Sequence, residues 1–159
     1  MANTYTQLYI QLVFAVKGRE QLIPELHREN VQKYITGIIT NKDHKCLAIY
    51  AMPDHIHILI GYNPSDSISD LVRDIKVSSS KFISNQNWMP KGFKWQEGFG
   101  AFSYSRSHLD RIVKYIRNQK EHHSRQTFKA EYLELLENFN VDYNDKYLFD
   151  WVDCWGIFR

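Results

Sequence analysis

The stretch that decides the fold is residues 45–62, KCLAIYAMPDHIHILIGY. Its two mostly apolar runs are joined by only Pro53 and Asp54. So short a connection joins antiparallel strands, and the stretch therefore predicts a β-hairpin. Successive side chains of a strand alternate between its faces, so the three isoleucines of the second run share one face. His55 and His57 share the other face, at the very beginning of that strand.

The segments around the hairpin predict two more strands and two helices. Residues 5–16 alternate as a strand does, and Pro24 stands at the first position of a helix through about residue 40. Ser67 and Asp70 form a capping box for a helix through about residue 85, and a fourth strand is expected within 93–105. The order is βαββαβ, which is the ferredoxin-like fold of the α+β class. That fold packs two helices on one face of an antiparallel sheet and leaves the other face free.

Additional C-terminal helices are expected after the fourth strand. Ser107 and Asp110 form a second capping box, which begins a third helix through about His123. A last helix spans roughly 127–139, and an aromatic tail follows. The 159 residues, 43% of them hydrophobic and 14% aromatic, suffice for one ordinary domain. We therefore expect a single domain over 1–159, with 127–159 as its C-terminal helix and tail.

The composition indicates the cellular compartment of the protein and the kind of partner it could bind. No apolar run approaches the roughly 20 residues of a membrane span, and the start lacks the basic region and cleavage site of a signal peptide. Cys46 and Cys154 share no C-x-x-C spacing, so a cytoplasmic protein is expected. The net charge is +2. Residues 1–130 carry 18 basic against 11 acidic side chains, and the remainder two against seven, so the body is compatible with a polyanionic partner and the tail is not.

The two histidines of the hairpin are candidate metal ligands. They lie about 7 Å apart along the strand at ~3.3 Å per residue, so their rings can converge on one ion. Asp54 offers a carboxylate that can orient an imidazole N–H. The alternative is that His55 and His57 are partly exposed sheet residues. As a metal ligand at the edge of a strand, His57 is expected to contribute little to the core. Two imidazoles make only half a metal site, so a third ligand is expected from elsewhere in the chain.

The third predicted helix carries a candidate nucleophile. Its core stripe, spaced i, i+3, i+4, i+7, consists of Leu109, Ile112, Val113 and Ile116. Tyr115 and Gln119 are four residues apart and lie one above the other on a face beside that stripe. The alternative is that Tyr115 only packs and that Gln119 is solvated.

Taken together, HIHILIGY, WQEGFGAFSYS and YIRNQKEHH resemble the single-tyrosine HUH transposases of small bacterial insertion sequences (TnpA type), where HUH means His-hydrophobic-His. The resemblance includes LVRDIKVSSSKFI and runs from YTQLYIQLVFAVKGR to YLELLENF and YNDKYLF. It implies that His55 and His57 are the metal-binding pair, that Tyr115 is the nucleophile and that Gln119 adds a third metal ligand. Only the last stretch, WVDCWGIFR, goes beyond the family pattern.

The activity that the resemblance implies is cleavage and rejoining of single-stranded DNA at insertion-sequence ends, in a bacterial or archaeal cytoplasm. The intermediate would be a 5′-phosphotyrosine, and the cofactor a divalent metal, Mg²⁺ or Mn²⁺. Two imidazoles and an amide oxygen suit Mn²⁺ at least as well as Mg²⁺. One alternative is a replication-initiator or relaxase-like nickase with the same HUH chemistry. Another is a catalytically inactive ferredoxin-like protein that binds nucleic acid.

Basic side chains on the second and third helices are the candidate DNA contacts. They are Arg73, Lys76, Lys81, Arg106, Arg111, Lys114, Arg117 and Lys120. The alternative for each is a solvated helix charge. Trp88, Phe93 and Trp95 could stack on unpaired bases or belong to the core. The resemblance implies that the DNA is a hairpin folded from one strand.

The final expectation is a homodimer whose active sites are shared in trans. In the strand order 4-1-3-2, the histidine strand lies two strands from the fourth, roughly 10 Å away. The short connection after the fourth strand is expected to leave the helix that carries Tyr115 little slack to return to its own histidines. The resemblance implies that this helix reaches the neighbouring subunit, in the commonest closed assembly, a C2 dimer.

Overall fold

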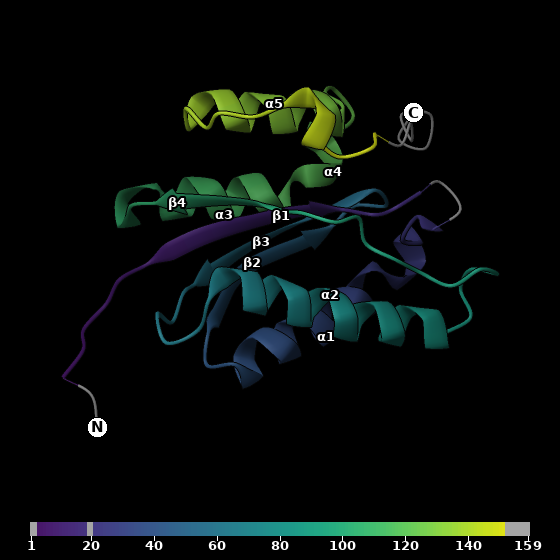
Figure 1. The fold of residues 1–159 in the computed structure, drawn as a ribbon, viewed down its shortest axis with the longest axis horizontal. Helices are drawn as coiled ribbons and strands as arrows, with labels where there is room; N and C mark the ends of the chain where they lie inside the picture. The colour runs from purple at the N-terminus through teal and green to yellow at the C-terminus, as the bar shows by residue number, and fades with distance from the viewer. Residues whose placement is uncertain (1–2, 19–20, 152–159) are drawn as a thin grey trace.

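A computed structural model describes residues 3–18 and 21–151, drawn as a ribbon in Figure 1. Its centre is a four-stranded sheet with the order β2-β3-β1-β4, antiparallel throughout. The strands are β1 Tyr9–Ala15, β2 Lys45–Ala51, β3 His55–Gly61 and β4 Gly100–Tyr104. This arrangement confirms the predicted ferredoxin-like fold of the α+β class.

The predicted hairpin places the histidine strand in the middle of the sheet. Tyr50 of β2 and Val13 of β1 lie opposite His57 on either side of β3. The turn is closed by the Met52 N–H, which donates to the His55 carbonyl at 2.8 Å. Six of the seven residues of β3 are buried, because neighbouring strands cover both of its edges and helices cover both of its faces.

Two helices cover the isoleucine face of β3, as predicted. They are α1 Arg28–Asn41 and α2 Ile68–Asn85, which lie together below the sheet in Figure 1. The main core between them and the sheet includes Ile35, Ile56, Ile58 and Ile75. The Ser67 hydroxyl accepts the Asp70 N–H at 3.0 Å and caps α2 as expected. Pro24 instead precedes a 3-10 turn, Glu25–His27, and α1 begins only after it.

The opposite face of the sheet is also covered, so the expectation of a free face is wrong for this chain. Three helices lie there, α3 Leu109–Arg117, α4 Gln119–His122 and α5 Phe128–Asn138 (Figure 1). Ile116 of α3 packs on Leu59 and Ala48 of the sheet. Tyr132 of α5 joins the main core with Phe102. The histidine face of β3 is therefore an interior surface.

The third helix differs from the prediction at both ends. A 3-10 turn, Arg106–His108, precedes α3, and the helix has His108 as its N-cap without a side-chain hydrogen bond. The capping box predicted from Ser107 and Asp110 therefore does not form. The helix ends at Arg117, because Asn118 has φ −99° and ψ 23°, and α4 restarts at Gln119. α5 begins as expected, with the Thr127 hydroxyl accepting the Ala130 N–H.

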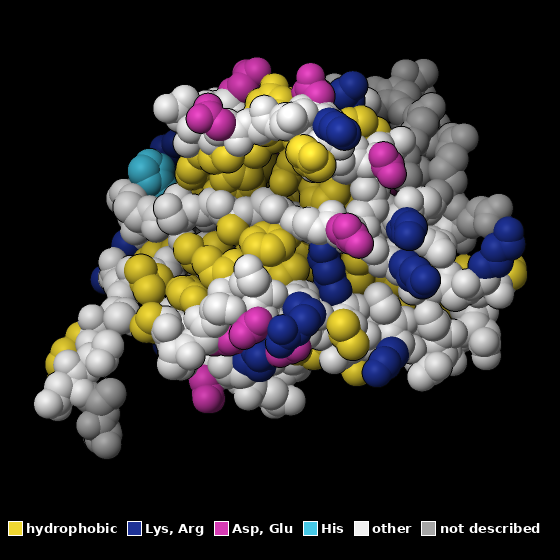
Figure 2. Space-filling model, viewed as in Figure 1, with side chains coloured by type: hydrophobic (Ala, Val, Ile, Leu, Met, Phe, Trp, Pro, Cys, Tyr) yellow, Lys and Arg dark blue, Asp and Glu magenta, His cyan; other side chains and the backbone are white. Residues whose placement is uncertain are grey.

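The remaining described segments complete the layers. A 3-10 turn, Asp145–Tyr147, follows α5. β4 is an edge of the sheet, and Figure 2 shows apolar surface on both sides of it, towards α5 and towards α2. Cys46 is a free thiol, whereas Cys154 and the rest of residues 152–159, the end of the aromatic tail, lie outside the described residues. Within the described ranges, no helix is both long and apolar enough to cross a membrane.

Candidate active site

The HUH pair lies at the start of β3 on the face covered by α3 and α5, and neither ring is exposed to solvent. His55 Nδ1 is 2.7 Å from Asp54 Oδ1, and His57 Nδ1 is 2.7 Å from Gln11 Oε1. Since these oxygens only accept, each Nδ1 carries the hydrogen and donates it. The alternative of partly exposed sheet histidines is therefore excluded, and Asp54 orients an imidazole as expected.

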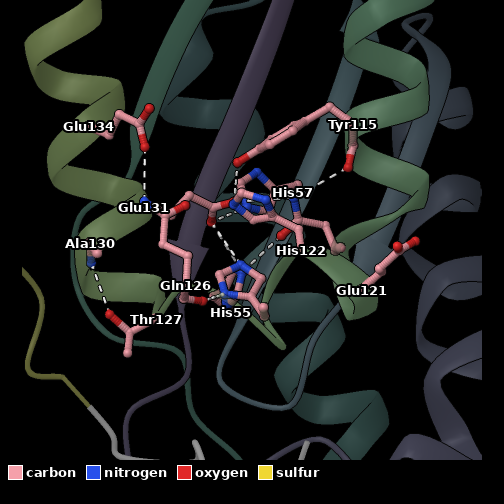
Figure 3. A network of polar contacts seen from close by, with 12 residues as sticks. His55, His57, Tyr115, Glu121, His122, Gln126, Thr127, Ala130, Glu131 and Glu134 are labelled. Carbon is pink, nitrogen blue, oxygen red and sulfur yellow. Dashed lines mark hydrogen bonds and ion pairs between the residues drawn. The ribbon is translucent and has the colours of Figure 1, made fainter.

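Two residues that the sequence did not single out face this pair. Glu131 extends from α5, and its Oε1 lies 2.8 Å from His57 Nε2, 3.0 Å from His123 Nε2 and 3.6 Å from His55 Nε2. Figure 3 shows the Glu131 side chain reaching across to the His55 and His57 rings. One donor atom from each of these four residues lies within 4.8 Å of every other. We call His55, His57, His123 and Glu131 the His/Glu cluster; its donor types and spacing fit a divalent metal ion.

The charge of the His/Glu cluster is set by Glu131. Burial raises the pKa of the Glu131 carboxyl, but the facing imidazoles of His57, His123 and His55 outweigh it and hold that pKa well below its usual range. Burial lowers the pKa of His57 by more than Glu131 raises it. Burial also lowers the pKa of His55, yet Asp54 and Glu131 together leave it raised. The cluster therefore holds an ionised carboxylate against three buried rings.

Tyr115 of α3 reaches the same carboxylate. Its hydroxyl donates to Glu131 Oε2, and its ring stands edge-on to His57 with centroids 5.9 Å apart (Figure 3). The side chain is partly buried. Burial first, and then the Glu131 carboxylate, raise the pKa of the Tyr115 phenol far above its ordinary value of about 10. Without a cation nearby, this hydroxyl therefore keeps its proton at neutral pH.

Gln119 is buried in the same site and is not the solvated residue of the alternative interpretation. Its Oε1 lies 3.4 Å from His55 Nε2. Its Nε2 lies 3.2 Å from Glu131 Oε2 and 3.5 Å from the Tyr115 carbonyl. The break in the helix at Asn118 comes just before Gln119, so the structure brings all four sequence-predicted site residues together in one chain.

This arrangement corrects one step of the sequence argument. The tyrosine helix was expected to have too little slack to return to its own histidines. Instead, α3 packs directly on β2 and β3 of the same chain, and Tyr115 lies beside His57. The 3-10 turn before α3 reverses the chain within a few residues, which the distance between strands alone does not reveal.

The basic candidates fall into separate groups. Arg111 and Lys114 line a hollow of about 320 Å³ beside Tyr115, together with Asn118, His122 and Arg125. Arg117 and Lys120 line a neighbouring hollow of about 430 Å³, and Lys120 is also paired with Glu25 at 2.6 Å.

The other basic and aromatic candidates do not line these hollows. Lys81 and Arg106 are exposed, and Arg73 pairs with Asp70 on its own helix at 3.0 Å. Lys76 is turned inward, where its Nζ donates to the carbonyls of Gln96 and Gly98. Of the aromatic candidates, Phe93 and Trp95 are buried in the core, and Trp88 is partly buried and stacks on His27 at 4.0 Å.

A signal for Glu131 was present in the sequence. The buried positions of α5 are Phe128, Glu131, Tyr132 and Leu136, an i, i+3, i+4, i+8 stripe. A carboxylate within such a stripe has to find a partner in the interior. His123 gave no such signal, because it follows His122 in a polar run and its direction depends on how α4 ends.

Comparisons with known proteins identify the family. The model of the IS200-like transposase family matches residues 4–119, which is most of the chain. The chain therefore belongs to this family, and it is a transposase of the HUH type, a class of DNA-cleaving enzymes. The match ends before α5, so Glu131 and His123 lie outside the matched residues.

Individual relatives agree with this assignment. The ISDra2 transposase TnpA of Deinococcus radiodurans is 25% identical over 120 residues, which cover 72% of this chain and 86% of the relative. A crystal structure of a putative transposase from Deinococcus radiodurans R1 superposes with a TM-score of 0.56 at 24% identity, covering 75% of this chain and 95% of that one. A REP-associated tyrosine transposase bound to a REP hairpin gives a TM-score of 0.58 at 15% identity, covering 94% and 91%. The structural similarity to these two solved structures establishes the fold.

Proposed function

We propose that this protein cleaves and rejoins single-stranded DNA at insertion-sequence ends, through a 5′-phosphotyrosine intermediate at Tyr115 and with a divalent metal. The observation that carries the proposal is the shared carboxylate. Glu131 contacts the HUH imidazole of His57 through one oxygen and the Tyr115 hydroxyl through the other. A nucleophile and a candidate metal site therefore meet in one chain. As a transposase it would act in the cytoplasm of a bacterial or archaeal cell.

The chemistry explains why a tyrosine is used. Its phenolic oxygen attacks the scissile phosphorus, the tyrosine–phosphate bond forms, and the bond from phosphorus to the 3′ oxygen breaks. The departing 3′ oxygen takes up a proton, and the Tyr115 proton is already directed at Glu131 Oε2. The covalent ester keeps the phosphodiester energy for rejoining, in which a 3′ hydroxyl attacks and the phenolate leaves.

The residues that the resemblance assigns to the metal are His55, His57 and Gln119. Their donor atoms are present at the site, and Gln119 Oε1 is 3.4 Å from His55 Nε2. A bound divalent ion, Mg²⁺ or Mn²⁺, would neutralise charge developing on the phosphate and favour ionisation of the phenol. Asp54 and Gln11 hold the His55 and His57 rings by their Nδ1 atoms. The Nε2 atoms of both rings are thereby turned towards the place where the ion would bind.

DNA would approach through the basic hollow beside Tyr115. Arg111, Lys114 and Arg125 line it, together with Glu121, which pairs with Arg125 at 3.7 Å. A phosphate there therefore meets a mostly basic lining beside Tyr115. Of the described acidic side chains of the C-terminal part, none lines this hollow, and Figure 2 shows several acidic side chains gathered over α5. Charge-removing changes at Arg111 and Lys114 should weaken DNA binding and reduce its salt dependence, while Lys76 should contribute nothing to it.

The homodimer with active sites shared in trans stays a prediction. Mixing subunits decides it, because Tyr115→Phe and His57→Gln chains each lack one half of the site. If the sites are shared, the mixture recovers cleavage and the DNA is attached only to the His57→Gln chain. If each chain uses its own histidines, as the single-chain geometry favours, the mixture stays inactive.

The experiment that tests the proposal is covalent trapping. Wild-type protein with Mn²⁺ or Mg²⁺ and a single-stranded hairpin substrate should give a protein–DNA adduct through the 5′ end. Tyr115→Phe should abolish the adduct and leave DNA binding nearly unchanged, because it removes one hydroxyl. Tyr34→Phe, on α1 at the opposite face of the sheet, is the matched control and should behave as wild type. An adduct that persists in Tyr115→Phe contradicts the assignment.

A further inference from the structure

We propose that the metal ligands of this chain are His55, His57, His123 and Glu131, and that Gln119 positions Glu131 instead of serving as the third ligand. This inference rests on the proposed function and changes the ligand set that the family resemblance implies. Two of the four ligands come from the C-terminal segment, beyond the residues matched by the family model.

The first argument is the orientation of the three rings. Each Nδ1 donates to an oxygen that can only accept: Asp54 for His55, Gln11 for His57 and the Gln126 carbonyl for His123, at 2.7, 2.7 and 2.8 Å. Such partners fix the tautomer and leave each Nε2 free to bind, as is usual around protein metal sites. His123 is therefore oriented for metal binding in the same way as His55 and His57.

The second argument is the convergence of the donor atoms. Bonds of about 2.0–2.2 Å to one ion place neighbouring ligand atoms roughly 3 Å apart. Glu131 Oε1 lies 2.8, 3.0 and 3.6 Å from the Nε2 atoms of His57, His123 and His55. All four residues are at least 97% buried. A buried anion facing three inward-turned Nε2 atoms needs a cation between them, either protons on the rings or one metal ion.

The third argument concerns the amide of Gln119. Its NH₂ group lies within donating distance of Glu131 Oε2, the same oxygen that accepts the Tyr115 hydroxyl. The two oxygens of the Glu131 carboxylate therefore have different partners: Oε1 faces the three rings, and Oε2 faces Tyr115 and Gln119. Gln119 therefore holds the carboxylate in the orientation that directs Oε1 at the three rings, and the same contacts tie the nucleophile to the cluster.

The donor set has a consequence for metal choice. Three imidazoles and one carboxylate suit Mn²⁺, Co²⁺ or Zn²⁺, whereas Mg²⁺ prefers oxygen ligands and retains its waters. We therefore expect the full chain to bind Mn²⁺ and Co²⁺ without DNA, and Mg²⁺ at equal concentration to displace little of either.

The test measures metal binding without DNA. Chelator-treated protein is titrated with Mn²⁺, and free Mn²⁺ is followed by electron paramagnetic resonance. His123→Gln and Glu131→Gln should weaken binding at least tenfold. Gln119→Ala should weaken it less and should leave the visible spectrum of the Co²⁺ form unchanged, because no donor is lost. His108→Ala, an exposed histidine before α3, is the control and should bind as wild type.

A second measurement uses wild-type protein, so it does not depend on how the variants fold. X-ray absorption of the Co²⁺-loaded protein should show three imidazoles per ion. Two imidazoles, or wild-type affinity in both His123→Gln and Glu131→Gln while Gln119→Ala loses binding, would overturn the inference and leave the proposed function standing. Wild-type protein that binds no divalent ion but still forms the Tyr115 adduct in chelator would overturn the inference and also the metal part of the proposed function.

Discussion

Replacing His57 with alanine should destabilise the metal-free protein strongly, although a histidine at the start of a strand was expected to contribute little to the core. The ring is fully buried; its Nδ1 donates to Gln11 at 2.7 Å, and its Nε2 lies 2.8 Å from Glu131 Oε1. Each buried partner left unsatisfied costs about 1–3 kcal/mol, and Glu131 also loses one of the rings that balance its charge. The expected loss is about 3–5 kcal/mol, as is usual when a large buried ring is replaced by alanine.

Urea and thermal denaturation in chelator, without DNA, measure this loss. For a chain of this size, about 3–5 kcal/mol corresponds to a fall in Tm of roughly 6–20 °C. His108→Ala serves as the control and should change stability by less than about 0.5 kcal/mol, as exposed residues usually do. A loss below about 1 kcal/mol for His57→Ala would show that the ring is accessible to water in solution and would refute the closed site. His57→Gln is therefore the safer variant for cleavage assays.

Three further changes test the scaffold. Ser67→Ala removes the cap of α2 and should cost about 1 kcal/mol in urea denaturation; an unchanged midpoint would mean that the Asp70 N–H finds another acceptor. Gly100→Ala places a Cβ 2.7 Å from the Tyr132 hydroxyl and should cost about 1–3 kcal/mol, part of which Tyr132→Phe should restore. Burial lowers the pKa of Lys76 to about 8, so between pH 8 and 10.5 the unfolded chain holds a proton that the folded chain has lost. Wild type should therefore gain stability relative to Lys76→Met across that window, and a relative loss would show that its two carbonyl partners hold the ammonium form.

The hairpin and its two histidines could be predicted because their signals are local. A two-residue turn fixes the antiparallel pairing, and the period of two in β3 decides which side chains share a face. The Ser67 cap and the end of α2 were likewise set by neighbouring residues. Tyr115 and Gln119 could be placed on one helix face by their spacing, and both reach the site even though the helix breaks between them.

The burial of Glu131 could have been predicted from its stripe, but its partners and the position of His123 could not, because they depend on tertiary packing. Whether α5 returns to the histidine face is decided by the Phe128–Tyr132 side of that helix meeting Phe102 and the sheet, contacts between segments far apart in the chain. The burial of His55 and His57 follows from that return and not from the strand itself. The position of His123 depends on where α4 ends, which only the contacts around it determine.

The burial pattern implies a direction of approach for the DNA. The His/Glu cluster and Gln119 lie in the interior, whereas Tyr115 borders two hollows, one of them lined by Arg111 and Lys114. A phosphate entering there meets Tyr115 before it can meet any imidazole of the His/Glu cluster. Tyr115 is tied to Glu131 Oε2, so the same hydrogen bond that holds the nucleophile at the cluster also stands between the hollow and the rings. In the proposed reaction, Glu131 Oε2 is therefore placed to take up the Tyr115 proton when a phosphate enters this hollow.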